Sequence, residues 1–181
     1  MELIVLSQNI KEPVTVDDVK AYMGYPTGDQ DALIHHLITT ARVWLENRCA
    51  ISVTEKDYAV YFEKDDRMGN WYELPVSPVI GDITVLSDGE EVTFSRKGLK
   101  KVSISTVGLY RTVLIGEQPS TGIEVRFRAG EKNIVANEII KRIVSTMFNS
   151  REDGGGDEVF EGRLPFDTLR LIESIDQNTG F

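Results

Sequence analysis

The sequence predicts an α+β fold, in which a small helical bundle of about four helices carries an antiparallel β-layer inserted between helices 2 and 3. Three observations support this fold class. Apolar residues recur at helical spacing before residue 50 and after residue 133, whereas they alternate with period two between about 53 and 130. Strands do not alternate with crossover helices, which argues against a doubly wound sheet.

Two helices are predicted at the start of the chain. Thr15 and Asp18 have the spacing of a capping box and Gly24 is a stop signal, so a short helix is expected over about 15–23. A longer helix is predicted over about 29–48, which carries an apolar stripe with helical period. Asp29 and Asp31 stand at its start, where the helix dipole favours acidic side chains.

The β-layer is predicted over about 53–130. The run Leu74-Pro75-Val76-Ser77-Pro78-Val79 contains two prolines that cannot both donate to a sheet ladder, so a rigid extended crossing into a new strand is expected. Asp88-Gly89 predicts a hairpin before a strand that includes Val92-Thr93-Phe94. Residues 123–129 alternate apolar with charged side chains, so one face of that strand is expected to be solvated or to meet a partner.

The last part of the chain is predicted to be helical again. A broad apolar stripe indicates a third helix over about 134–150. The charged, glycine-rich segment 151–158 is typical of a flexible linker, and Pro165 is expected in the first turn of a short fourth helix. We therefore expect a single domain over residues 1–152, followed over residues 153–181 by a linker, a short helix and a C-terminal tail.

Composition narrows the classes of function. The chain has 181 residues, 41% of them hydrophobic, and a formal net charge of −9 that opposes general affinity for nucleic acid. The basic run Arg96-Lys97 with Lys100-Lys101 is expected to be a solvated loop. No segment approaches the roughly 18 apolar residues of a membrane span and the N-terminus does not resemble a signal peptide, so we expect a protein that is soluble and intracellular when made.

No constellation of residues predicts catalysis or a cofactor. His35 and His36 are neighbours on a predicted helix, so their side chains point about 100° apart and cannot chelate one metal ion as an i, i+4 pair would. Cys49 is the only cysteine. Gly154-Gly155-Gly156 lacks the Lys-Ser/Thr of a phosphate loop. We expect no enzyme activity, no metal and no cofactor.

The aromatic residues of the β-layer allow two interpretations. Core packing where the helices meet the sheet is the simpler one. The aromatic residues Trp71 and Tyr72 are alternatively predicted to form an oligomer contact, because aromatic side chains are enriched at protein interfaces.

Several segments, in this order, resemble those of the head-tail connector (adaptor) proteins of tailed phages. The matching pieces are Val14–Met23, Asp29–Arg48, Leu74–Val79, Ile123–Gly130, Met147–Glu152 and Leu164–Phe166. No one of these motifs is specific by itself, and their order carries the resemblance. The chain departs from the pattern at Cys49-Ala50, where the family has Thr-Gly, and over residues 92–120, which are longer and less typical.

The resemblance implies a structural virion protein without enzyme activity. Such a protein is expected to form a homo-oligomeric ring, a dodecamer in the virion, in the neck between the portal protein and the tail-completion proteins. DNA would pass through the ring without specific binding, and an acidic lining would repel the duplex. The protein would be made in the bacterial host cytoplasm and would have no membrane partner.

Residues 159–181 are predicted to dock on the portal protein. Phe166, Leu169 and Ile172 lie along the weakly amphipathic fourth helix, and the tail ends at Phe181. A segment of this kind is suited to ordering on a partner. Three alternatives remain open: a tail-completion or neck protein that binds the adaptor, a small binding protein unrelated to phages, and a small acidic enzyme or regulator with a polar pocket in the β-layer.

Overall fold

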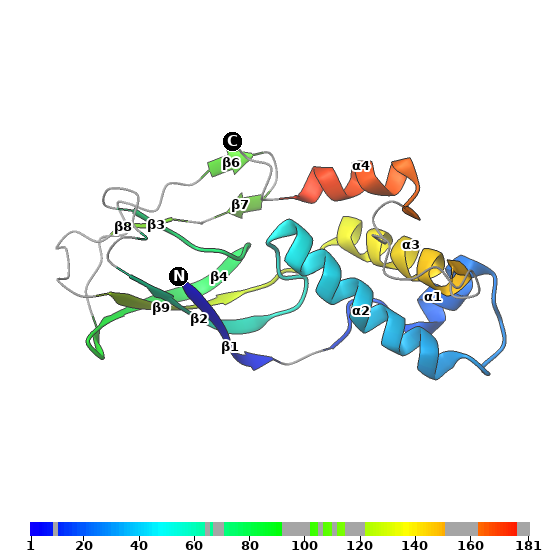
Figure 1. The fold of residues 1–181 in the computed structure, drawn as a ribbon, viewed down its shortest axis with the longest axis horizontal. Coiled ribbons are helices and arrows are strands. Elements are labelled where there is room, and N and C mark those ends of the chain that lie inside the picture. The colour runs from blue at the N-terminus through cyan, green and yellow to red at the C-terminus, as the bar shows by residue number, and fades with distance from the viewer. Residues whose placement is uncertain are drawn as a thin grey trace. The chain divides into compact units, whose positions relative to one another are not determined.

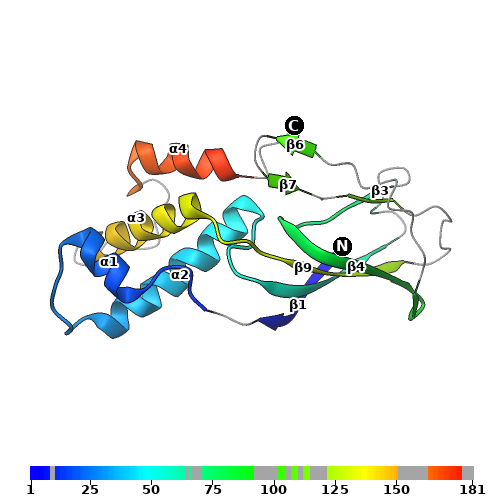
Figure 2. The ribbon, with the colours of Figure 1, turned by 180° about the vertical axis from the view of Figure 1, so that it is seen from behind.

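The computed structural model describes residues 1–8, 11–63, 66, 71–91, 102–104, 107–109, 112–114, 122–150 and 163–176. The chain divides into two compact units, which Figure 1 shows from one side and Figure 2 from behind. The sheet unit comprises Met1–Ile10 and Thr54–Glu131, and the helical unit comprises Lys11–Val53 and Lys132–Phe181. Each unit contains its own cluster of buried apolar side chains.

Within the described ranges the helical unit contains four α-helices. These are α1 (Val16–Met23), α2 (Asp31–Cys49), α3 (Ile134–Ser150) and α4 (Phe166–Ile175). The predicted capping box is confirmed: the Thr15 hydroxyl accepts from the Asp18 backbone N–H, and the Asp18 side chain accepts from the Thr15 backbone N–H. Gly24 ends α1 in the left-handed conformation, at φ 68°.

The core of the helical unit forms between α2 and α3, which lie side by side in both ribbon views, with α4 against α3. Its fully buried side chains include Val19, Ile34, Ile38, Leu45, Ile139, Ile140, Ile143 and Ile172. The apolar stripes predicted for the two long helices therefore face each other. Val135, in the first turn of α3, is apolar but 37% exposed, so it lies outside this buried set.

The sheet unit is built on a five-stranded antiparallel sheet with the order β1-β2-β9-β4-β5. Its strands are β1 (Glu2–Gln8), β2 (Lys56–Phe62), β9 (Ile123–Ala129), β4 (Val79–Ser87) and β5 (Glu90–Glu91). Two small antiparallel sheets accompany it in the part of the unit that the structure describes. One pairs β3 (Trp71–Glu73) with β8 (Thr112–Leu114), and the other pairs β6 (Val102–Ile104) with β7 (Val107–Leu109).

The side chains of the central strand β9 alternate between the core face and the open face of the sheet. Ile123, Val125 and Phe127 are buried on the core face, together with the β2 side chains Tyr58, Val60 and Phe62 that pair with them. Arg126 and Arg128 are exposed on the open face. The predicted alternation of β9 is thus confirmed, and the register with β2 explains it, since paired residues share a face of the sheet.

The α+β fold class is confirmed, with most of the sheet lying between α2 and α3 in sequence. The hairpin at Asp88-Gly89 is also confirmed, because these two residues connect β4 to β5 with positive φ angles of 52° and 84°. Sequence analysis missed β1, which precedes the helices and adds an edge strand to the sheet. Its consecutive aliphatic residues carry no period-two signal, so only pairing with β2 identifies it.

The second helix begins at Asp31 and not at Asp29, because Gln30 is its N-cap and the Asp29 carboxylate accepts hydrogen bonds from the Thr27 and Tyr25 hydroxyls. The predicted strand at 92–94, the basic run at 96–101 and the linker at 151–158 lie outside the described residues.

Candidate interaction surfaces

The helix α4 presents one end of its predicted apolar stripe to solvent and buries the other. Phe166 is 67% exposed, and the Arg170 guanidinium lies 5.1 Å from the centre of its ring. Leu169 is half-buried against the helical core, and Ile172 is 1% exposed within it. Phe181 lies outside the described residues. Phe166 is therefore the one described member of the predicted portal-binding set that is available on the surface.

An ion pair fixes the end of α4. The Asp176 carboxylate, which is fully buried, accepts a hydrogen bond from Nη1 of Arg48 at 2.5 Å. Arg48 belongs to the last turn of α2, so this contact joins the ends of two helices that are far apart in sequence. Together with Ile172, the pair gives α4 a defined position in the helical unit.

The predicted oligomer contact falls on the short strand β3. Tyr72 is 2% exposed, and its ring centre lies 5.1 Å from that of Phe62 in the core of the sheet unit. Trp71 pairs through its backbone with Leu114 of β8, and its side chain is outside what the structure describes. Tyr72 is thus a core residue of the sheet unit.

Two ion pairs among the described residues lie on the open face of the five-stranded sheet. Nε of Arg128 lies 2.7 Å from Oδ1 of Asp57, and Nε of Arg126 lies 2.5 Å from Oε1 of Glu124. Hydrogen bonds from Arg128 and from the Ser7 hydroxyl hold the pKa of Asp57 below its usual range. These bonds connect β1, β2 and β9 across the sheet.

A shallow groove of about 460 Å³ runs beside these charges. It is lined in part by Leu6, Asp57, Ile80, Thr84, Arg126 and Arg128. Within the described ranges no three His, Cys, Asp or Glu side chains are grouped to hold a metal ion. The groove does not resemble the deep pocket with convergent acids that an acidic enzyme would need.

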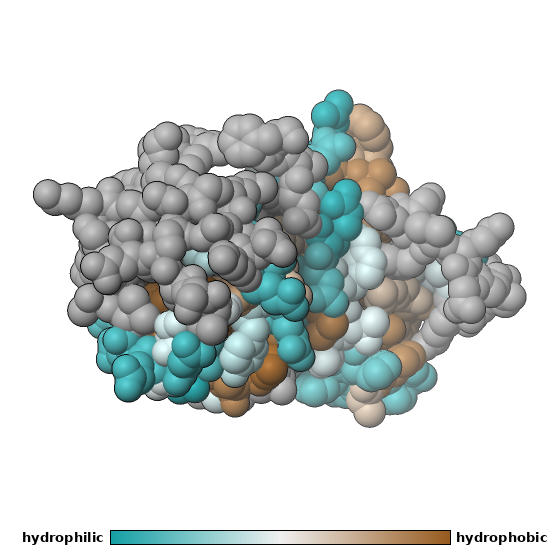
Figure 3. All heavy atoms as spheres, turned by 60° about the vertical axis from the view of Figure 1, so that its left-hand side comes forward, coloured by the Kyte–Doolittle hydropathy of each residue, from teal (hydrophilic) through white to brown (hydrophobic). Residues whose placement is uncertain are grey.

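The edge of the sheet at β1 was not singled out by sequence analysis. Leu3 and Ile4 are each 39% exposed, Val5 is 46% exposed and Leu6 is 51% exposed. Apolar residues also reach the surface between polar ones on the face drawn in Figure 3. The only sequence signal for this edge is its run of four consecutive aliphatic residues, which by pattern alone fits a strand or a buried helix.

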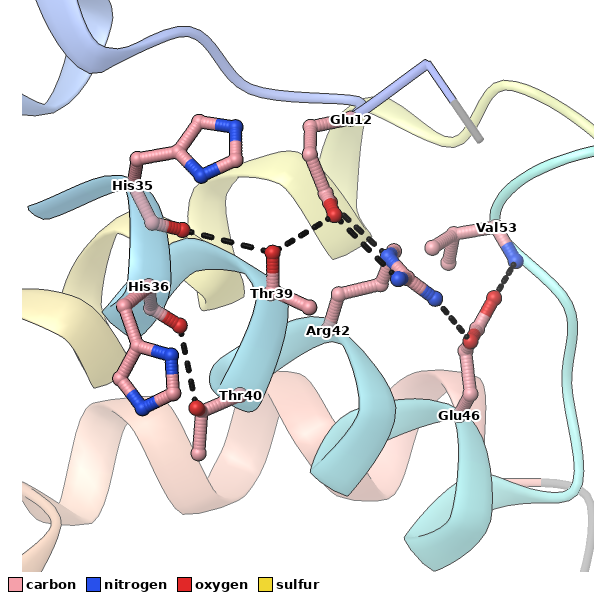
Figure 4. Close-up of polar contacts among 8 residues, drawn as sticks. All are labelled: Glu12, His35, His36, Thr39, Thr40, Arg42, Glu46 and Val53. Carbon is pink, nitrogen blue, oxygen red and sulfur yellow. Dashed lines mark hydrogen bonds and ion pairs between the residues drawn. The ribbon is translucent and has the colours of Figure 1, made fainter. Parts of the chain in front are cut away.

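A buried charge network surrounds Arg42 in α2 (Figure 4). Its Nε lies 2.8 Å from Oε2 of Glu12, and its Nη1 lies 2.8 Å from Oε2 of Glu46. The other Glu46 oxygen accepts the backbone N–H of Val53 at 3.0 Å. Figure 4 also shows that the rings of His35 and His36 point to different sides of α2, as expected for neighbours on a helix. The network lies largely inside the helical unit, with the side chains of Arg42, Glu46 and Glu12 exposed by 3%, 8% and 14%.

No protein-family model matches the sequence, and no curated protein matches it significantly. The fold is similar to that of a chain from the neck of an empty gene transfer agent (GTA) particle computed with C6 symmetry. The TM-score is 0.70 at 16% identity, over 96% of this chain and 94% of that chain. A chain from the virion of a native GTA particle gives a TM-score of 0.68 at 18% identity, over 97% and 95%.

A third similar structure comes from the neck of a native GTA particle computed with C12 symmetry. Its TM-score is 0.64 at 13% identity, and the match covers 96% of this chain and 94% of that chain. At these identities the likeness shows the fold. None of the helices in the described ranges has the length and apolar character needed to cross a bilayer.

Proposed function

We propose that the chain is a structural protein of the neck of a tailed-phage-like virion, a head-tail adaptor between portal and tail. The observation that carries this proposal is the likeness of fold, over nearly the whole length of both chains, to chains from the necks and virion of GTA particles. The order of motifs in the sequence supports it independently. The adaptor would be made in the host cytoplasm and would act without enzymatic chemistry.

The adaptor would assemble as a homo-oligomeric ring of twelve copies. The C6 and C12 symmetries of the similar GTA necks are compatible with a twelve-fold ring. A closed ring is built from head-to-tail contacts, in which two different surfaces of each copy meet. Trp71 remains the aromatic residue proposed for such a contact, with Tyr72 holding strand β3 from within.

DNA would pass through this ring without being bound. The net charge of −9 supports this, because an acidic lining repels the phosphate backbone. The described arginines of the open face, Arg126 and Arg128, are each paired with a carboxylate. Their charges are therefore largely neutralised.

The portal contact is proposed to involve α4 and the tail after it. Phe166 would be the anchor that enters a portal pocket, since its ring is exposed and aromatic anchors dominate many interfaces. Leu169 and Ile172 would support the contact from the inner side of the helix, and Phe181 would extend it.

Recruitment to the portal ring tests the proposal. Light scattering would measure the mass of the portal ring of the same phage, alone and mixed with this chain; about one copy per portal subunit is expected. Phe166→Ala should weaken recruitment. Ile134→Ala is the matched control, because Ile134 is 82% exposed at the start of α3 and should bind as wild type does. Deleting α4 would be a poorer test, since it would remove Ile172 from the core.

A tail-completion or neck protein that binds the adaptor is the second candidate. It is favoured by the fact that the similar structures come from necks and a virion and are not specified as the portal side. Such a protein would not bind the portal alone. It would bind only a portal that already carries its adaptor. A chain that binds neither would overturn both assignments.

A further inference from the structure

The strand β1 leaves one side of its backbone unpaired among the described residues, since β2 is its only partner there. Leu3, Ile4, Val5 and Leu6 are all 39% or more exposed, and they alternate between the two faces of the sheet. An exposed apolar edge strand is a template for pairing with another chain.

The opposite edge of the same sheet carries acidic side chains. Among the described residues its outermost strand is β5, whose residues Glu90 and Glu91 are both exposed and pair with Ser87 and Leu86 of β4. An acidic edge discourages pairing, and β1 has no charged residue after Glu2. The one protective irregularity in β1 is a bulge between Val5 and Ser7, which leaves Glu2–Val5 in regular register.

We propose that two copies of the free protein pair through β1, antiparallel and about a two-fold axis perpendicular to the sheet. With Ile4 on the axis, Leu3 of one copy lies opposite Val5 of the other, and the sheet continues across both copies. The core face and the open face of the sheet then each continue from one copy to the other, because paired residues share a face. Glu2 lies opposite Leu6 and not opposite a second Glu2, so no two like charges meet in the ladder, although one glutamate per copy lies beside an aliphatic side chain.

Pairing of β1 with β5 of a second copy is the weaker alternative. Among the described residues it would offer a ladder of two residues, and it would place both Glu90 and Glu91 beside aliphatic side chains. The self-pairing of β1 satisfies more backbone groups and buries apolar residues on both faces. The second copy of β1 is therefore the occupant that this edge fits.

The two-fold pair is a state of the free protein and does not depend on the proposed function. A cyclic ring uses head-to-tail contacts, whereas the β1 pair is isologous, so the two arrangements are distinct. Pairing would cover an aggregation-prone edge before assembly.

Sedimentation velocity across the micromolar range tests this pairing. The wild type is expected to form a dimer. Val5→Lys should raise the dimer dissociation constant about a hundredfold, because it brings two ammonium groups into one apolar strip. Val43→Lys is the matched control: Val43 is 43% exposed on α2, Val5 is 46% exposed on β1, and the control should dimerise as wild type does.

Ile4→Lys, on the other face of β1, provides a second variant in case Val5→Lys perturbs folding, which circular dichroism would detect. It too should give a folded monomer. A wild type that stays monomeric throughout the concentration range would overturn the proposal. The β1 edge would then be available to pair with a strand of another protein. Dimers or larger assemblies that both lysine variants leave unchanged would overturn it as well.

Discussion

Arg42 and Glu12 form a buried ion pair, 2.8 Å between Nε and Oε2, although thirty positions separate them in the sequence. Glu46 binds the same guanidinium and the backbone N–H of Val53. Glu12 and Val53 each lie within two residues of a point where the chain passes from one unit to the other. The network thus holds the chain segments around Glu12 and Val53 against α2.

The charge of Arg42 is maintained inside this network. Burial would lower its pKa, but the hydrogen bond to Glu12 and the charge of Glu46 outweigh that effect and keep the pKa above its ordinary value. A buried pair of this kind is costly to break, since removal of one partner leaves the other charge uncompensated.

We expect Arg42→Met to destabilise the helical unit by about 3–5 kcal/mol, because two carboxylates would lose their buried partner. Urea unfolding followed by far-ultraviolet circular dichroism would measure the change. Arg170→Met is the control: Arg170 pairs with Glu173 at 3.2 Å with its side chain 66% exposed, and its loss should cost less than about 1 kcal/mol. Equal effects from the two variants would contradict a structural role for the network.

Gly130→Ala is expected to destabilise the sheet unit by more than about 3 kcal/mol, since strain and a backbone clash would add. Its φ is +127°, and an added Cβ would lie 2.2 Å from the Thr54 carbonyl oxygen. Gly81→Ala provides the comparison. Gly81 has φ +75° with nothing near the added Cβ, so only about 1–2 kcal/mol of backbone strain is expected. Thermal unfolding of both variants would measure the difference, and a milder effect at Gly130 than at Gly81 would refute it.

Acid should weaken the connection among β1, β2 and β9. The pKa of Asp57 lies below its ordinary value of 3.8, chiefly through Arg128 and then Ser7. The ionised carboxylate therefore stabilises the fold above about pH 4, and this contribution is lost as the pH falls below 3.8 toward the folded pKa. Both partners are partly exposed, so the effect should be small.

The comparison of wild type with Asp57→Asn tests this pH dependence. The variant should melt at a lower temperature than wild type at about pH 6, and the difference should shrink as the carboxylate becomes protonated. A difference that stays constant down to about pH 3 would show that Asp57 acts through packing and not through its charge.

Ile172→Ala and Phe166→Ala should separate the two sides of α4. Loss of the buried Ile172 side chain is expected to cost about 2–5 kcal/mol of stability, as for other large-to-small changes in a core. Loss of the exposed Phe166 ring should change stability by less than about 0.5 kcal/mol. Denaturant unfolding would measure both, and a large loss of stability for Phe166→Ala would show that this residue packs within its own chain.

Local signals in the sequence predicted much of the fold. The helix over 134–150 was predicted with the boundaries that the structure has, because its apolar stripe is long and periodic. The capping box at Thr15 and the turn at Asp88-Gly89 were predicted for the same reason: each depends on a few neighbouring residues. The edge strand β1 was missed, since its aliphatic run fits a buried helix or a strand equally well by pattern alone.

The interaction surfaces depended on contacts that no local pattern contains. The sequence by itself determined the α+β class, the helices and the two faces of β9, because these follow from the spacing of apolar side chains along the chain. Tertiary structure alone decided that Ile172 and Tyr72 are buried while Phe166 is exposed, and that Glu12 reaches Arg42. The physical reason is that burial and ion pairing depend on which distant segments meet, and residues with the same local pattern can lie on either side of a packed layer.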